Sequence, residues 1–396
     1  MRAGWQQTTL GSIAQIGAGN SAPQGDALFA DGVHPFFRTS DAGRVRFGDI
    51  VESTDYLNDE GIKGLRRFPA GTILFPKSGA STFLNHRVMM GVDGFVSSHL
   101  ATIVGDEAKV DRRYLLYFLS TVSAQDLVQD HAYPSLNLPL ISGIPVALPP
   151  LPEQQRIVGI LDAAFDGIAT AKANAEQNLQ NARALFESHL QSVFTQRGKG
   201  WVVKRLDDAC DLITCGVAAR PKYVDVGVPF LSAKNVKRGK IIWSGYNCVS
   251  KKTHDELTKH NKPLRGDVLY TRVGSYGEAA VIEENIEFSV FVSLTLIKPI
   301  KHLLNNYFLK YYLNSSEVKE LAKRSISSSG VGNLNVGTVR EFPIHLPPLT
   351  EQASIVASLN KISAETQRLE SLYQRKLAAL DELKKSLLHQ AFSGAL

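Results

Sequence analysis

The chain has 396 residues, of which 44% are hydrophobic and 21% charged, and these values exclude both a single ordinary core and long disordered segments. A formal net charge of +6 and a pI near 9.0 favour an anionic partner, although many basic proteins bind no nucleic acid. Three unevenly placed cysteines suit neither a disulfide framework nor a zinc site, and no apolar run reaches membrane-spanning length, so a reduced, cytoplasmic protein without a metal is expected.

The first part of the chain, residues 1–150, is predicted to be a mixed α/β domain. GTILF from Gly71 and ATIV from Ala101 are rich in residues that favour strands. YLLYFLSTVSAQDLV from Tyr114 has apolar residues at helical spacing. Both kinds of element are therefore expected within this domain.

A long helix is predicted to follow over residues 151–198. The phrase LPPLPEQQRIV from Leu148 contains a proline pair that cannot join a helix interior, then a proline and a glutamate that suit the first turn of a helix. Apolar residues follow at steps of three and four along one face. This first stripe consists of Ile157, Leu161, Ala164, Ile168, Ala171, Ala175, Leu179 and Ala182.

The second half of the chain repeats the first. LPPLTEQASIV from Leu346 lies 198 residues after the phrase at Leu148, and the same shift matches the two helical runs without a gap. Upstream the match is looser, and a second mixed domain is predicted over residues 199–348, followed by a second helix over residues 349–396. The second stripe consists of Leu369, Tyr373, Leu377, Leu380, Leu383, Leu387 and Ala391.

These stripes predict that the two helices pair. Steps of three and four over such a length suit a coiled-coil seam, although a helix packed on its own domain is the alternative. A helix of this length spans about 65 Å and would hold the domains apart, so the second helix must run back along the first to bury its stripe. The predicted fold class is α+β, with two similar mixed α/β domains separated by two long antiparallel coiled-coil-like helices in a pseudo-twofold internal duplication.

Polar loops that recur in both domains are the candidates for binding an anionic ligand. Small residues let a backbone approach DNA closely, and basic, hydroxyl and amide side chains contact phosphates or base edges. An ordinary turn would look similar, so both interpretations stay open. Candidates after the strand-like segments are Lys77, Ser78, Ser81 and Thr82 in the first domain, and Arg272, Ser275 and Tyr276 in the second. Candidates before the long helices are Tyr133, Ser135, Asn137, Ser328, Asn333 and Asn335, and a weaker third set is Arg38, Ser40, Lys234 and Asn235.

Some polar residues favour a structural interpretation. Asn137 and Asn335 agree between the halves, which favours a shared backbone role over the reading of different bases. His86 and His99 have no partner pattern and are interpreted as structural.

The sequence offers no catalytic site. A methyltransferase acting on adenine needs an N/D-P-P-Y/F loop, whereas both proline pairs here are flanked by leucines. GVGNLN from Gly330 lacks the preceding strand and following helix of a phosphate-binding loop, and neither GxxxxGK[ST] nor HExxH occurs. A non-catalytic chain that binds no cofactor or metal is therefore predicted.

The duplicated organisation, with LPPLxEQxxIV opening each helix, resembles the specificity subunit of type I restriction-modification systems over the whole chain. The resemblance implies two target recognition domains, each reading one half of an interrupted double-stranded DNA target, and two spacer helices that set the gap and hold two methyltransferase subunits. It also implies that S-adenosylmethionine, ATP and Mg bind to those subunits and to motor-nuclease subunits, giving an adenine-N6 methyltransferase and an ATP-dependent endonuclease. Residues expected at the spacer and partner-docking starts of the helices are Leu148, Pro149, Pro150, Leu151, Glu153, Gln154, Leu346, Pro347, Pro348, Leu349, Glu351 and Gln352.

The alternative is a coiled-coil scaffold whose two heads bind protein or another polyanion. Salt dependence separates the two hypotheses, because DNA binding through several phosphate contacts weakens steeply as salt rises.

Overall fold

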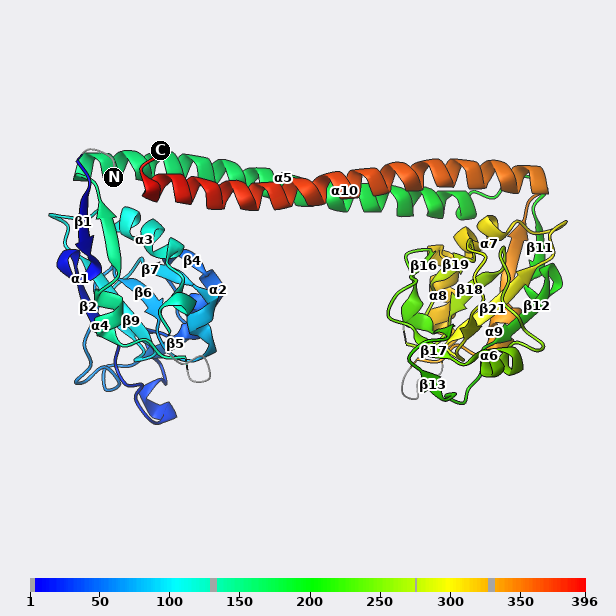
Figure 1. The fold of residues 1–396 in the computed structure, drawn as a ribbon, viewed down its shortest axis with the longest axis horizontal. Helices are drawn as coiled ribbons and strands as arrows, with labels where there is room; N and C mark the ends of the chain where they lie inside the picture. Colours follow the sequence, from blue (N-terminus) through cyan, green and yellow to red (C-terminus); the bar gives the residue numbers. More distant parts are fainter. Residues whose placement is uncertain (1–3, 129–133, 275, 327–331) are drawn as a thin grey trace. The chain divides into compact units, whose positions relative to one another are not determined.

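The computed structural model describes residues 4–128, 134–274, 276–326 and 332–396, and the chain forms two compact units. Unit 1 contains Met1–Asn174 and Lys376–Leu396, and unit 2 contains Ala175–Arg375. Each unit therefore combines one mixed α/β head with one segment of each long helix (Figure 1). The predicted internal duplication of two α/β domains and two long helices is confirmed.

The head of unit 1 contains a five-stranded sheet in the order β2-β9-β6-β7-β4 and a three-stranded sheet in the order β5-β3-β8. The central strand β6 is apolar throughout because both of its faces are covered: Ile73 and Phe75 face one hydrophobic cluster, and Leu74 faces another. The strands are β2 Ala14–Ala18, β3 His34–Phe37, β4 Phe47–Ile50, β5 Asp55–Leu57, β6 Ile73–Pro76, β7 Arg87–Met90, β8 Phe95–Val96 and β9 Leu100–Gly105. The helices of this head are α1 Leu10–Ile13, α2 Thr39–Val45, α3 Arg112–Thr121 and α4 Leu138–Ser142.

The head of unit 2 repeats this plan with two four-stranded sheets, in the orders β12-β21-β18-β19 and β13-β17-β14-β20. Its central strand β18 shows the same alternation, with Val268 and Tyr270 in one cluster and Leu269 in another. The strands are β12 Cys210–Cys215, β13 Tyr223–Val224, β14 Val228–Leu231, β17 Asn247–Val249, β18 Val268–Thr271, β19 Ala279–Val281, β20 Ser289–Val290 and β21 Leu294–Pro299, with a separate hairpin of β15 Val236–Lys237 and β16 Lys240–Ile241. The helices are α6 Lys251–Leu257, α7 Asn306–Leu313, α8 Ser316–Arg324 and α9 Val336–Arg340.

An antiparallel strand pair leads from each head into its long helix. In unit 1, β1 (Gln6–Thr9) pairs with β10 (Pro145–Leu148), and α5 begins at Leu151 and ends at Thr195. In unit 2, β11 (Val202–Arg205) pairs with β22 (Pro343–Leu346), and α10 covers Leu349–Ser393. Both helices start directly after a proline pair, a position that suits proline because the first N–H groups of a helix have no partner within it.

Within each unit the segments of α5 and α10 run antiparallel. Lys172 forms an ion pair with Asp381 in unit 1, and Arg183 Nε lies 3.4 Å from Glu370 Oε1 in unit 2. The alternative interpretation also holds in part, because Ile157 and Leu161 belong to the hydrophobic core of their own head. The helices are therefore paired with each other and packed on the heads.

The predicted stripes are confirmed except at one residue. Every member of the first stripe is buried or half-buried, but Leu383 of the second stripe is 46% exposed. Lys384 faces inward instead, with its ammonium 4.8 Å from the centre of the Phe165 ring and 5.1 Å from that of Phe47. Desolvation at this site lowers the pKa of Lys384.

A buried glutamine fastens α5 to the head of unit 1. Gln154 is fully buried, and its Oε1 accepts a hydrogen bond of 2.8 Å from the backbone N–H of Asp111. Its Nε2 donates to the carbonyl oxygens of Lys109 at 3.0 Å and Pro149 at 2.8 Å. One side chain thus forms hydrogen bonds with backbone groups of both the loop before α3 and the proline turn before α5.

Unit 2 contains the same arrangement around Gln352. Its Oε1 accepts from the N–H of Asn305 at 2.8 Å, and its Nε2 donates to the carbonyl oxygens of Leu303 at 3.0 Å and Pro347 at 2.9 Å. Gln352 is also fully buried. The glutamine of the repeated LPPLxEQ motif therefore joins the head to its long helix in both units.

Gln352→Ala is expected to destabilise unit 2 by about 2–4 kcal/mol, because three backbone groups, one of them in a fully buried hydrogen bond, lose the side chain that pairs with them. Hydrogen exchange followed by mass spectrometry on the full chain would show faster exchange around Asn305, while unit 1 serves as the internal reference. Gln374→Ala, at an exposed position of α10, is the matched control. Equal protection in the two variants would contradict the role of Gln352.

Candidate nucleic-acid interface

Three loops meet where β6 ends in unit 1. The N–H of Lys77 donates to the carbonyl of His99 at 3.0 Å, and the N–H of Leu136 donates to the carbonyl of Lys77 at 2.8 Å. Ser78 forms an isolated antiparallel bridge with Ser135. We call residues 77–79, 97–99 and 134–136 the unit 1 loop junction.

The unit 1 loop junction presents polar side chains to solvent. His99 and Ser135 are exposed, and His99 Nδ1 shares a hydrogen bond of 2.7 Å with Ser78 Oγ. Gly79 has φ +74, and a Cβ at this position would meet no atom within 4 Å, so the backbone faces open space. These features suit the close approach of a polar ligand.

Unit 2 has an equivalent junction where β18 ends. The N–H of Arg272 donates to the carbonyl of Ser293 at 3.0 Å, and the N–H of Leu334 donates to the carbonyl of Arg272 at 2.8 Å. Val273 forms an isolated antiparallel bridge with Asn333, which is equivalent to the bridge between Ser78 and Ser135 in unit 1. We call residues 272–274, 291–293 and 332–334 the unit 2 loop junction. Candidates from separate stretches of sequence are therefore adjacent in both units.

The structure corrects the prediction for Arg272. This residue is only 7% exposed, and its guanidinium donates to the carbonyl oxygens of Leu334 and Val292, each at 2.8 Å, and to Asn333 Oδ1 at 3.0 Å. A guanidinium occupied by three protein acceptors is not free to reach a phosphate or a guanine. Arg272 instead fastens the loops of the unit 2 junction together.

Other candidates also bind the protein's own backbone. Asn137 accepts from the N–H of Leu140 and caps α4, and Asn335 accepts from the N–H of Gly337 and caps α9, in agreement with the structural interpretation of this pair. Asn235 was a DNA-contact candidate, but it is 1% exposed and donates to two carbonyl oxygens. Thr82 is fully buried, so it cannot contact a ligand either.

The remaining candidates are more accessible. Ser40 and Lys234 are exposed, whereas Tyr276 is half-buried against the core of unit 2. Ser81 Oγ donates to the carbonyl of Ser78 at 3.1 Å. Arg38 is half-exposed but forms an ion pair with a carboxylate of its own head. Tyr133, Ser275 and Ser328 lie outside the described residues.

His99 is a member of the unit 1 junction that sequence reasoning interpreted as structural. It is the residue immediately before β9, and Ser293 stands immediately before β21 in unit 2. A comparison of the two repeats at the starts of these strands could have found it.

Some side chains at the starts of the long helices are buried and others are exposed. Pro149, Gln154, Leu346, Pro347 and Gln352 are buried, so these five of the residues predicted at the spacer and partner-docking helix starts are not exposed to a partner. The exposed residues are Pro150, Pro348 and Leu349, and those of intermediate exposure are Leu148, Leu151, Glu153 and Glu351.

The described part of the chain contains no cluster of three or more His, Cys, Asp or Glu side chains that could hold a metal ion. Among its helices, none combines the length and apolar character needed to cross a membrane.

Comparison with known proteins identifies the duplicated unit. The family model described as type I restriction modification DNA specificity domain matches residues 2–181 and again residues 198–376. The chain belongs to this family. The EcoBI specificity subunit of Escherichia coli is 22% identical over 89% of this chain and 79% of its own length, and the EcoDI specificity subunit of the same species is 21% identical over 99% and 88%.

Two solved structures share the fold of this specificity subunit. A chain from a study of complex assembly and conformational transition in a type I R-M system has a TM-score of 0.80 at 20% identity, and covers 100% of this chain and 99% of its own. The HsdS subunit of Thermoanaerobacter tengcongensis has a TM-score of 0.62 at 20% identity, with coverages of 100% and 98%. The chain is thus the non-catalytic specificity component of a type I restriction-modification system, and the relatives do not support the scaffold alternative.

Arg272→Ala is expected to destabilise the specificity subunit's second head by about 2–4 kcal/mol, since the carbonyl oxygens of Leu334 and Val292 and the amide oxygen of Asn333 lose a charged donor. Urea-dependent hydrogen exchange of β18 and β21 in the full chain would measure this loss. Arg220→Ala, at an exposed position of the same unit, should leave exchange unchanged. If Arg272→Ala also left it unchanged, the anchoring role would be wrong.

Proposed function

We propose that the two loop junctions contact the two halves of one interrupted double-stranded DNA target. The observation that carries this proposal is that one chain contains the same three-loop junction twice, with different exposed side chains. Unit 1 presents His99 and Ser135, whereas unit 2 presents Asn333. A shared backbone frame with different polar side chains suits two half-sites of different sequence.

Basic residues next to the junctions support DNA as the ligand. In unit 2, the N–H of Ala233 donates to Ser293 Oγ at 3.0 Å, which puts the exposed Lys234 beside the junction. In unit 1, Lys77 is half-exposed within the junction itself. Together with a net charge of +6, these cations favour contact with phosphates.

The long helices carry a repeated exposed patch that suits a repeated partner. Several positions of α5 have the same residue type as the position 198 residues later in α10. Among these pairs, both residues are exposed only in Leu185 with Leu383 and Ser188 with Ser386. Leu185 is 61% exposed and Leu383 46%. An exposed leucine side chain does not lower the free energy of the folded chain, and the two residues of each patch lie on one face of the helix. We therefore assign each patch to one methyltransferase subunit.

Two methyltransferase subunits would then bind one specificity subunit, and motor-nuclease subunits would complete the restriction enzyme. S-adenosylmethionine, ATP and Mg would bind to these partners in the cytoplasm. The helices would set the unread gap between the two half-sites.

Co-expression with the partner methyltransferase, followed by mapping of N6-methyladenine across the host genome, tests the reading function. Modification is expected at one interrupted motif, with methylated adenines on opposite strands of its two halves. If the complex forms with methyl donor present and no common motif emerges, the units do not read DNA.

Leu185→Asp and Leu383→Asp are expected to weaken methyltransferase binding, each at one site, because a carboxylate replaces an apolar contact. Native mass spectrometry of the complex should show two methyltransferase chains per wild-type subunit, one in each single variant and none in the double variant. Leu372→Asp is the matched control, because Leu372 is 42% exposed on the same helix but has no leucine at the equivalent position of α5. Full occupancy in the double variant would contradict the assignment.

A further inference from the structure

Arg66 and Asn261 occupy equivalent places in the two units, and sequence reasoning passed over both. Each stands five residues before a glycine that turns the chain into the central strand, Gly71 with φ +89 and Gly266 with φ +94. The two side chains also lie over equivalent strands, as their contacts show.

In unit 1, Asn20 fixes the backbone of Arg66 beside the loop junction. The N–H of Arg66 donates to Asn20 Oδ1, and Asn20 Nδ2 donates to the carbonyl of Arg66, both at 2.8 Å. The N–H of Ser98, a junction residue, donates to the carbonyl of Asn20 at 2.7 Å. Arg66 is therefore two hydrogen-bonded steps from the unit 1 junction.

The guanidinium of Arg66 is held in place without a counter-ion. Its central carbon lies 4.9 Å from the centre of the Phe68 ring, and its Nη1 would lie 3.3 Å from a Cβ placed on Gly17 of β2. Arg66 is exposed, and within the described ranges no carboxylate pairs with it. Its five N–H donors are available to an external acceptor.

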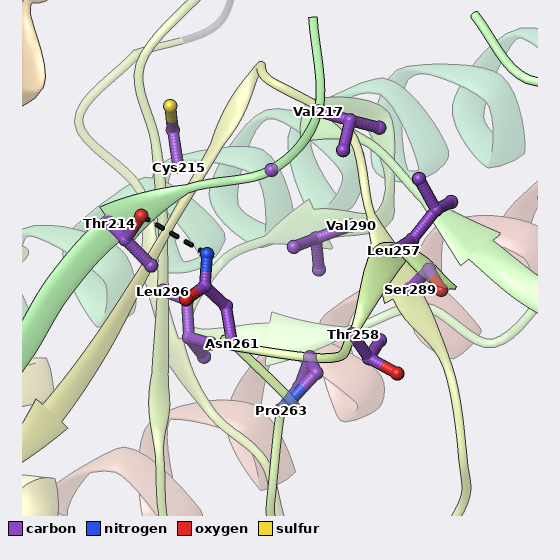
Figure 2. Close-up of a pocket in the computed structure, with 11 residues that line it drawn as sticks. Thr214, Cys215, Val217, Leu257, Thr258, Asn261, Pro263, Ser289, Val290 and Leu296 are labelled. Carbon is purple, nitrogen blue, oxygen red and sulfur yellow. Dashed lines mark hydrogen bonds between the residues drawn. The ribbon is translucent and has the colours of Figure 1, made fainter. Parts of the chain in front are cut away.

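In unit 2, Asn261 lies over β12, where its Nδ2 is 3.4 Å from Thr214 Oγ1 (Figure 2). It borders a hollow of about 60 Å³ that is also lined by Val217. The N–H of Val292, a residue of the unit 2 junction, donates to the carbonyl of Val217 at 3.0 Å. Asn261 is therefore also close to its junction, across a hollow in place of the hydrogen-bonded link of Arg66.

We propose that Arg66 and Asn261 are specificity-determining residues, with Arg66 reading a G·C pair in one half-site and Asn261 an A·T pair in the other. Arginine bonds to O6 and N7 of guanine through two N–H groups, and asparagine bonds to N6 and N7 of adenine through its amide. The Oδ1 of Asn261 has no partner among the described residues, and its Nδ2 keeps a second hydrogen, so both atoms are available.

If the two units read different bases, they must have different side chains at equivalent positions. Phosphate contacts serve both half-sites alike, whereas residues that read different bases must differ at equivalent positions. Arg66 and Asn261 differ in this way, and each is preorganised by its own unit. This inference rests on the proposed DNA-reading function.

Genome-wide mapping of N6-methyladenine with Arg66→Ala and Asn261→Ala, each co-expressed with the methyltransferase, tests the proposal. Arg66→Ala should relax one G·C position of one half-site by about ten- to hundredfold in preference, and Asn261→Ala one A·T position of the other half-site. The rest of the motif should stay unchanged. Both substitutions leave the main-chain bonds to Asn20 and the strand pairing in place.

The neighbouring residues provide matched controls. Arg67, 3.4 Å from Asp93, and Lys262, which pairs with Glu287, already have carboxylate partners, so Arg67→Ala and Lys262→Ala should leave the motif as in the wild type. An intact motif in Arg66→Ala or Asn261→Ala, or weaker modification at all sites without relaxation of any position, would overturn the assignment of that residue. Absence of any motif in the wild type would instead refute the proposed function.

Discussion

The joint between each head and its long helix depends on one buried glutamine. A fully buried amide that bonds one N–H and two carbonyl groups holds the helix start against its head, because leaving any of these polar groups without a partner costs free energy. Gln154 and Gln352 make the same three bonds in the two units. Each head is therefore tied to the start of its long helix by hydrogen bonds of a single side chain.

The loop junctions show how exposed side chains can vary on a shared backbone frame. Their connections are main-chain hydrogen bonds, such as Leu136 to Lys77 and Leu334 to Arg272, which do not depend on side-chain identity. The exposed side chains are therefore free to differ between the units. Arg272 shows the limit of this freedom, since its side chain itself holds the unit 2 junction together.

The sequence predicted the duplication, the paired helices and the family, because proline pairs and apolar spacing are local signals. Which polar residues face solvent was harder to predict, since burial depends on contacts distant in sequence. Asn235 and Thr82 are of residue types that often contact ligands, yet both side chains are buried. Arg66 was missed because its contacts with Asn20 and Gly17 join residues that are distant in sequence.

Unit 1 is assembled from both ends of the chain, and this has a consequence for biosynthesis. Phe392 packs against Tyr114 with ring centres 5.2 Å apart, and Ala391 is fully buried in the same core. The first head to leave the ribosome therefore lacks part of its core until Ala391 and Phe392 have been synthesised, whereas unit 2 ends at Arg375. A premature stop between Arg375 and Ala391 would consequently damage the head that lies earlier in the chain, although unit 2 would be intact up to Arg375.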